Sequence, residues 1–245
     1  MRNELSAWFV AAGILLQEIS AKAGNVPFGG LENKTGYEEN KKLPEIEILD
    51  LCSGPGNFVN HLSFAYPNIN AICVDSNSEF VAYGSERFPR WRFIVGDAVK
   101  IHLDRTFDFV TMSSGYHHIP DDQKLALMKN IAAHLREKGK VVVCENILPS
   151  YKNDTERPAA VNLFYDEFQK CRAKGELTES SALLLEEVRQ SDLRQDDERK
   201  VSYEIFREPV ESAGLAIEKD IAVWQPQVFK ESNAGTHVFV LRKGS

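Results

Sequence analysis

The stretch that decides the fold lies at residues 48–58 and reads ILDLCSGPGNF. An apolar run ends at the acid Asp50, and a turn that contains Gly54 and Gly56 leads directly into a helical pattern. Glycines let the backbone approach a ligand closely, and the N-terminus of a helix presents free N–H groups. We therefore predict a strand, a ligand-binding turn and a helix in succession, in preference to an ordinary tight turn.

The turn differs from the dinucleotide-binding fingerprint G-x-G-x-x-G. If Gly54 and Gly56 are its first pair, the third glycine falls on Val59, and if Gly54 is the second glycine, Cys52 replaces the first. Asp50 would also face an anionic pyrophosphate, and the two like charges would repel each other. The acid is better suited to a ligand that carries an ammonium group.

Short apolar runs alternate with helical patterns on the C-terminal side of this turn. Near-continuous apolar strands separated by helices indicate a parallel sheet covered on both faces. The last two predicted strands are joined by an irregular loop, which makes an antiparallel pair. We expect an α/β fold, a doubly wound, mostly parallel seven-stranded sheet with an antiparallel last strand. The predicted strands are 46–51, 71–75, 91–95, 107–112, 140–145, 216–224 and 236–242, and the predicted helices between them are 56–66, 76–88, 120–136 and 203–213.

Two segments lie outside this alternation. Near the N-terminus apolar residues recur at helical spacing, and a signal peptide with a cleavage site at 21–23 is the alternative interpretation. Residues 150–200 contain no strand pattern but two helical ones, at 162–174 and 181–193. We therefore predict an N-terminal helical cap segment (1–44), a sheet domain (45–149 and 201–245) and a helical insertion (150–200) that caps the substrate.

Composition restricts the partners of the chain. Its 245 residues include 29 Lys and Arg against 36 Asp and Glu, a formal net charge of −7. This balance disfavours nucleic acid or an anionic membrane as partner, because neutralising phosphates requires Lys and Arg. The four cysteines form no C-x-x-C pair, which favours free thiols in the reducing cytoplasm. Whether the chain forms a homodimer stays open.

The glycine turn resembles motif I of the class I S-adenosylmethionine-dependent methyltransferases, which reads D-x-G-x-G-x-G. Asp50, Gly54 and Gly56 fit this pattern, and Cys52 stands in place of its first glycine. Asp75 ends the second predicted strand, where the family binds the ribose hydroxyls of the cofactor. The resemblance implies a Rossmann-like domain that binds S-adenosylmethionine.

Later motifs follow in the family's order. Asp97 and Ala98 come after the third predicted strand, where the family places an acid and a backbone N–H beside adenine. Residues 107–119 resemble motif IV, which often carries a His-His pair, and residues 135–143 resemble the segment before the fifth strand. The resemblance covers residues 45–149 and 201–243.

The resemblance implies a set of site residues. His117 and His118 are the catalytic candidates, with His117 favoured as a base for the acceptor, and the alternative is that both are structural. The histidines show no metal-ligand spacing, so we expect no metal. Acceptor contacts could come from Tyr116, Glu145, Asn146, Tyr151, Phe164, Tyr165, Phe168, Phe28 and Tyr37, and residues 24–36 could close over the site. The expected cofactor-binding residues are Asp50, Cys52, Ser53, Gly54, Gly56, Asp75, Ser76, Asp97, Ala98 and Ser113.

These expectations lead to one main functional hypothesis. It is methyl transfer from S-adenosylmethionine to an oxygen or nitrogen atom of a small molecule, in specialised metabolism. Two alternatives keep the fold, namely use of the cofactor for cyclisation or decarboxylation, and a regulatory protein that binds the cofactor without turnover. An RNA or protein acceptor is disfavoured by the acidic composition.

Overall fold

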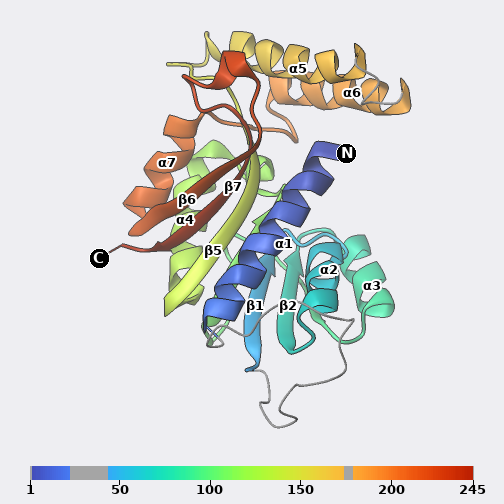
Figure 1. The fold of residues 1–245 in the computed structure, drawn as a ribbon, viewed down its shortest axis with the longest axis vertical. Coiled ribbons are helices and arrows are strands. Elements are labelled where there is room, and N and C mark those ends of the chain that lie inside the picture. Colours follow the sequence, from blue (N-terminus) through green and yellow to red (C-terminus); the bar gives the residue numbers. More distant parts are fainter. Residues whose placement is uncertain (1, 23–43, 174–178, 245) are drawn as a thin grey trace, which may run out of the picture.

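The fold is built on one seven-stranded sheet with the strand order β3-β2-β1-β4-β5-β7-β6 (Figure 1). A computed structural model describes residues 2–22, 44–173 and 179–244. Among the described strands, only β7 runs antiparallel to its neighbours, β5 and β6, so the prediction of a mostly parallel sheet with an antiparallel last strand is confirmed. The strands are β1 (Ile46–Leu51), β2 (Ile69–Asp75), β3 (Arg92–Val95), β4 (Phe107–Ser113), β5 (Leu135–Ile147), β6 (Leu215–Trp224) and β7 (Gly235–Lys243).

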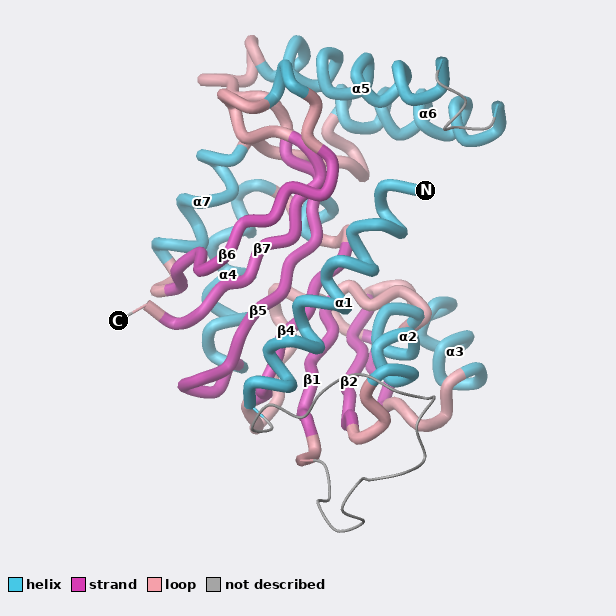
Figure 2. Tube along the Cα trace, viewed as in Figure 1, coloured by secondary structure: helices cyan, strands magenta, loops and turns pink. Residues whose placement is uncertain are grey.

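Helices cover both faces of the sheet. One face packs against α1 and α2, with α1 lying across β5, β6 and β7 (Figure 2). The other face packs against α4 and α7. The described helices are α1 (Arg2–Lys22), α2 (Asn57–Ala65), α3 (Ser78–Arg87), α4 (Lys124–His134), α5 (Arg157–Ala173), α6 (Glu179–Arg194) and α7 (Tyr203–Ser212), with short 3-10 turns η1 (Tyr116–His118), η2 (Asp121–Gln123) and η3 (Gln227–Phe229).

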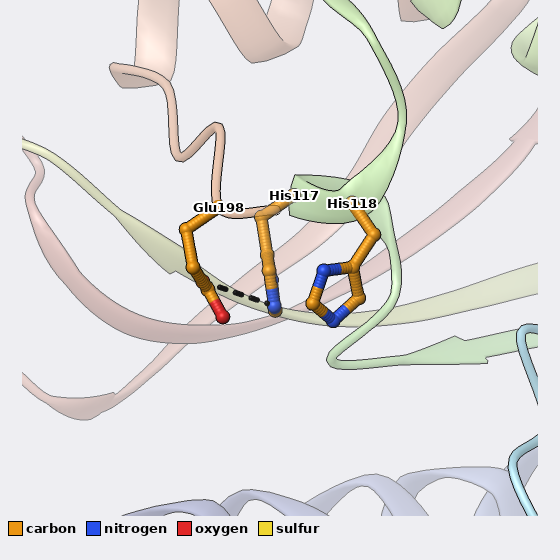
Figure 3. A group of neighbouring side chains, drawn as sticks. All are labelled: His117, His118 and Glu198. Atoms are coloured by element: carbon orange, nitrogen blue, oxygen red, sulfur yellow. Dashed lines mark ion pairs between the residues drawn. The ribbon is translucent and has the colours of Figure 1, made fainter. Parts of the chain in front are cut away.

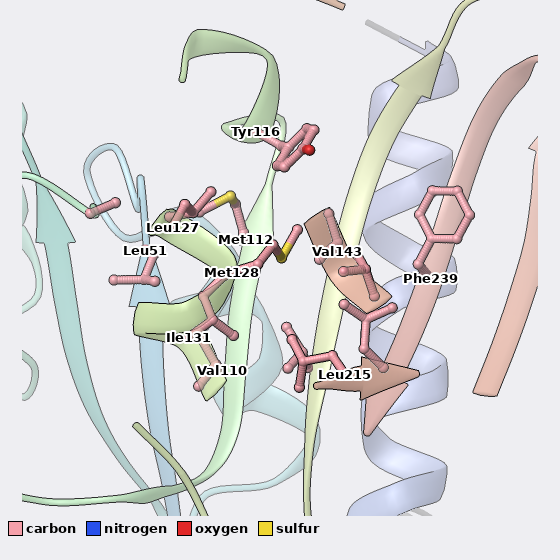
Figure 4. Packing of buried hydrophobic residues seen from close by; sticks show 14 of the residues in the cluster. Leu51, Val110, Met112, Tyr116, Leu127, Met128, Ile131, Val143, Leu215 and Phe239 are labelled. Atoms are coloured by element: carbon pink, nitrogen blue, oxygen red, sulfur yellow. The ribbon is translucent and has the colours of Figure 1, made fainter. Parts of the chain in front are cut away.

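The core on the α4 and α7 face explains the apolar runs of the central strands. Met112, Leu127 and Met128 are fully buried, and they interdigitate between β4 and α4 (Figure 4). Strands buried on both faces need apolar residues at successive positions, because neither face meets water. The continuous apolar runs seen in the sequence follow from this arrangement.

The helix predicted over residues 120–136 is wrong at both ends. It begins as the 3-10 turn η2, and α4 itself covers Lys124–His134. Leu135 already pairs with Phe107 in the sheet, and Arg136 binds the buried Asp108 carboxylate at 2.6 Å. This long-range ion pair and the burial of Leu135 favour strand over one more helical turn.

The segment between β5 and α7 forms a separate small core. Helices α5 and α6 pack on each other beyond the carboxyl end of β5, at the top of Figure 1. Leu148 bridges Ser202, and its N–H donates to the carbonyl of Val201 at 2.9 Å, so the segment leaves and re-enters the sheet domain at neighbouring points. The division of the chain into segments stays a prediction that this geometry supports.

Candidate active site

The glycine turn between β1 and α2 has the backbone conformation that a close ligand approach requires. Gly54 and Gly56 have φ values of 52° and 78°, in the left-handed region that glycine tolerates. A Cβ atom at Gly56 would lie 2.6 Å from the Phe93 ring, so only glycine fits there without a shift. Cys52 also adopts a left-handed φ of 52°, although it carries a side chain. The left-handed backbone at this position explains why the motif that the turn resembles has a glycine there, and Cys52 adopts the same conformation.

Asp50 brings an unsatisfied carboxylate oxygen to the end of β1. Its side chain is buried, and Oδ1 accepts a hydrogen bond from Thr111 Oγ1 at 2.6 Å, whereas Oδ2 has no partner among the described residues. Burial, together with the negative charge of Asp75, raises the pKa of Asp50 to about 7, and the Thr111 hydrogen bond opposes this shift. An orphaned carboxylate oxygen beside a glycine turn fits the ammonium group of an amino-acid ligand.

Asp75 connects the end of β2 to the glycine turn. Its Oδ2 accepts from the Gly54 N–H at 2.7 Å, and its Oδ1 accepts from the Asn77 N–H at 2.9 Å. Asn77 also caps α3 through hydrogen bonds from the N–H groups of Glu79 and Phe80. The helix predicted over residues 76–88 therefore begins later than expected, at Ser78, with Asn77 as its N-terminal cap.

The acid after β3 lies next to this group. The Gly96 N–H donates to the Asp75 carbonyl at 2.9 Å, which places Asp97 directly beyond that contact. Asp97 is partly exposed and forms an ion pair with Lys100 at 2.9 Å, and the hydrogen bond from Lys100 lowers the pKa of Asp97. Ala98 is buried, and its carbonyl accepts from the Asn130 side chain at 2.9 Å.

The loop after β4 is packed directly on the glycine turn. A Cβ atom at Gly115 would lie 2.5 Å from the Cβ of Cys52, so the two loops are in close contact. Ser113 ends β4, and η1 follows with His117 and His118. The structure thus brings the predicted cofactor residues and the His-His pair to the same carboxyl edge of the sheet, where open α/β sheets bind ligands.

His117 is held between two carboxylates. Its ring is buried, and Nδ1 lies 2.7 Å from Glu145 Oε1. On the other side of the ring, Nε2 lies 3.4 Å from Glu198 Oε2 (Figure 3). Burial acts to raise the pKa of Glu145 and of Glu198, but the interactions with His117 and other partners outweigh it, so the pKa of each carboxyl stays below its usual value.

His118 occupies a more open position. Its side chain is exposed, and its Nδ1 donates to the Asp197 carbonyl, 2.8 Å away. Desolvation at this edge, reinforced by the neighbouring His117, lowers the pKa of His118. The two rings lie 4.2 Å apart between centroids, tilted by 57°, so they present different nitrogens to their surroundings.

Glu198 is the residue that sequence reasoning missed. The sequence places it in a charge-rich run, 194–200, at the end of the helical insertion, where charged residues usually face solvent. In the structure this run lies next to η1, where the Arg199 N–H donates to the His117 carbonyl at 2.8 Å. No local signal in the sequence marks a contact between segments this far apart.

Several expected acceptor contacts pack into cores. Phe164, Tyr165 and Phe168 are buried against Trp224 and η3 in the core of the insertion. Tyr116 is buried beside α4 and α7. Asn146 accepts a hydrogen bond from Thr236 at 2.7 Å, and Tyr151 is half-buried. Phe28, Tyr37 and the expected closing segment 24–36 lie outside the described residues.

Comparison with known proteins agrees with this arrangement. Residues 48–139 match the family model described as a methyltransferase domain. The demethylmenaquinone methyltransferase of Thermotoga maritima is 29% identical over 110 residues, which cover 44% of this chain and 47% of that protein. A TehB-like S-adenosylmethionine-dependent methyltransferase from Corynebacterium glutamicum superposes with a TM-score of 0.52 at 18% identity, covering 82% of both chains.

A second solved structure covers nearly all of the chain. The 1,6-didemethyltoxoflavin-N1-methyltransferase of Burkholderia thailandensis superposes with a TM-score of 0.55 at 15% identity, covering 98% of this chain and 79% of that one. The match to a methyltransferase domain covers residues 48–139, and the solved structures show that the chain shares the fold of S-adenosylmethionine-dependent methyltransferases. The chain spans about half the length of the curated relatives it matches, such as the Thermotoga maritima protein.

Proposed function

We propose that this chain transfers a methyl group from S-adenosylmethionine to an oxygen or nitrogen atom of a small molecule. The observation that carries the proposal is the buried Asp50 Oδ2, which has no partner among the described residues and lies beside a left-handed glycine turn. The fit to the cofactor is chemical, since a buried acid matches its ammonium group and the Asp75 carboxylate can accept from ribose hydroxyls. When bound, the cofactor supplies an activated methyl group on a sulfonium.

The residues of the chain bind and orient in this proposal. Asp50 holds the ammonium group, Asp75 the ribose and Asp97 the adenine amine, while the Ala98 N–H and the backbone of residues 52–56 face the cofactor, flanked by Ser76 and Ser113. Holding the reactants in line can lower the barrier by about 7–11 kcal/mol in favourable systems, so few further groups are needed. His117 and His118 then face the acceptor.

A small molecule is the acceptor that the architecture favours. The chain is acidic, which opposes binding of nucleic acid. Helices α5 and α6 stand beyond the carboxyl edge of the sheet, where they can cover a bound molecule. The Burkholderia thailandensis neighbour is described with 1,6-didemethyltoxoflavin and S-adenosylhomocysteine bound. In the described part of the chain, Cys52, Cys73 and Cys144 form no disulfide bond, which supports a protein that acts in the reducing cytoplasm.

Calorimetry with S-adenosylhomocysteine tests the cofactor part of this proposal. The wild-type chain should bind, and Asp75→Ala should lose about ten- to a hundredfold in affinity, because a charge-assisted hydrogen bond is removed. Asp104→Ala, which changes an exposed acid in the loop between β3 and β4, is the matched control and should bind normally. Absence of wild-type binding would overturn the proposal.

The acceptor part needs a search for product. Wild-type protein, labelled S-adenosylmethionine and a metabolite extract should yield a molecule whose mass increases by one methylene group. Release of label with no methylated product would instead favour cyclisation or decarboxylation of the cofactor.

A further inference from the structure

We propose that His117, His118 and Glu198 form a binding site for a divalent transition metal, with Zn²⁺ as the best match. Each residue offers one ligand atom, and these atoms all lie within 4.8 Å of one another. Figure 3 shows the two imidazole rings and the carboxylate extending from η1 and the returning run in the same direction. The metal site stands on its own geometry, and its use in catalysis rests on the proposed methyl transfer.

The hydrogen bonds of the two histidines leave the same nitrogen available on each ring. Nδ1 of His117 lies 2.7 Å from Glu145 Oε1, and Nδ1 of His118 donates to the Asp197 carbonyl at 2.8 Å. Metal-binding histidines almost always donate their second ring N–H to a carboxylate or a backbone carbonyl, which fixes the tautomer and the ring orientation. Both imidazoles are thus oriented with Nε2 as the ligand atom.

Backbone hydrogen bonds of the residues before and after Glu198 hold it in place. The Asp197 carbonyl accepts from His118, and the Arg199 N–H donates to the His117 carbonyl at 2.8 Å. The carboxylate also pairs with Lys200, whose own N–H donates to Asp192 Oδ1 at 3.2 Å. These contacts hold the third ligand beside the histidines before any metal arrives.

The ligand set indicates the class of metal. Two imidazole nitrogens and one carboxylate are a set that Zn²⁺ uses in catalytic sites, where three protein ligands leave a coordination position open. Imidazole also suits Co²⁺ and Ni²⁺, whereas Mg²⁺ and Ca²⁺ prefer oxygen ligands. An acceptor with an oxygen atom beside the methylated position is the substrate chemistry that such an open position would take.

The competing arrangement is an imidazolium that balances the carboxylates without a metal. In that case His117 carries two protons, one toward Glu145 and one toward Glu198, and Nε2 has no lone pair for a ligand. Metal titration separates the two arrangements, because the imidazolium form has no saturable site that includes His118.

The experiment uses the whole chain of 245 residues, stripped of metal with a chelator and titrated with Co²⁺ and then Zn²⁺. We expect one equivalent of Co²⁺ to bind with visible absorption of a low-symmetry site, and Zn²⁺ to displace it. Glu198→Gln and His118→Ala should each weaken binding at least tenfold, since each removes a ligand, and Glu145→Gln should weaken it about 10- to 100-fold by releasing His117. His102→Ala removes an exposed histidine elsewhere and should change nothing.

Outcomes that overturn the metal site are distinct from those that overturn the proposed function. Absence of saturable binding, or binding equal in wild type, Glu198→Gln and His118→Ala, excludes the site. If Glu198→Gln does not fold, His118→Ala still tests the metal site, because His118 is exposed and its loss should weaken metal binding. The protein from which metal has been removed with the chelator is also titrated with S-adenosylhomocysteine. Cofactor binding without metal binding refutes only the metal site, and metal binding without cofactor binding refutes only the proposed function.

Discussion

Cys52 shows at the level of one residue how the glycine turn tolerates a departure from its motif. A side chain in the left-handed region is uncommon, because Cβ crowds the backbone. Cys52 nevertheless adopts a φ of 52°, and its Cβ packs against Gly115, which has no Cβ of its own. Burial and the neighbouring carboxylates raise the pKa of the Cys52 thiol to about 12, so the group stays neutral near the candidate site. The turn thus keeps the backbone path of a glycine.

The raised pKa of Asp50 predicts a pH-dependent stability difference between wild type and Asp50→Asn. A carboxyl whose pKa is about 7 when folded and 3.8 when unfolded binds its proton more tightly in the folded chain. The wild type therefore loses stability as pH rises from about 4 to about 7, by up to about 4 kcal/mol, and Asp50→Asn does not. Urea unfolding at pH 4 to 8 without cofactor measures this divergence.

The prediction is tested by how the difference in unfolding free energy between wild type and Asp50→Asn changes with pH. The Asp50→Asn variant would bury an unpaired amide, which costs about 1–3 kcal/mol at every pH. Asp104→Asn, which changes an exposed acid, serves as the control, and its free energy of unfolding should match that of the wild type at every pH. If the free energies of unfolding of wild type and Asp50→Asn changed in parallel with pH, Asp50 would not be a desolvated acid.

At the scale of elements, local patterns predicted the sheet, and long-range contacts decided what they missed. Apolar runs mark each strand because both faces of the sheet are covered, and Asp50 and Asp75 are placed by the strand ends in which they lie. The start of β5 depends on the pairing of Leu135 with Phe107, and Glu198 reaches His117 through the path of the insertion. Such contacts leave no periodic signal in either segment.

A buried ion pair connects the two helices of the insertion to the run that carries Glu198. Arg157 donates to Asp192 Oδ1 and to the Asp192 carbonyl at 2.6 Å each, and to the Lys200 carbonyl at 3.0 Å. Arg157→Met should lower the free energy of unfolding by about 3–5 kcal/mol, because Asp192 stays buried without its main partner. Chemical denaturation measures the loss.

Two further variants make the ion-pair prediction specific. Arg194→Met removes an exposed arginine from the end of α6, and its effect should stay within about 0.5 kcal/mol. Arg157→Met combined with Asp192→Leu should recover most of the stability, because neither member of the pair is left buried without the other. An Arg157→Met loss as small as that of Arg194→Met would mean that the insertion is not held by this pair.

On the scale of the whole molecule, α1 completes the layer that covers one face of the sheet. Ala11, Leu15 and Ile19 are fully buried there, in the core that also contains residues of α2, β1 and β7. Glu18 pairs with Lys219 of β6 at 2.6 Å. This packing agrees with the interpretation of the segment as an amphipathic helix of the folded protein. In the described part of the chain, no helix combines the length and hydropathy needed to cross a bilayer.

The contribution of α1 can be measured with one matched pair of variants. Leu15→Ala should lower the free energy of unfolding by about 2–5 kcal/mol, because it removes buried methyl groups and leaves a cavity against the sheet. Gln17→Ala, on the exposed side of the same helix, should change it by less than about 0.5 kcal/mol. Affinity for S-adenosylhomocysteine should stay near the wild-type value in both, since α1 covers a face of the sheet and the candidate site lies at its carboxyl edge. Equal, small effects of the two variants would show that α1 does not pack on the sheet in solution, and the face formed by β5, β6 and β7 would then require another cover.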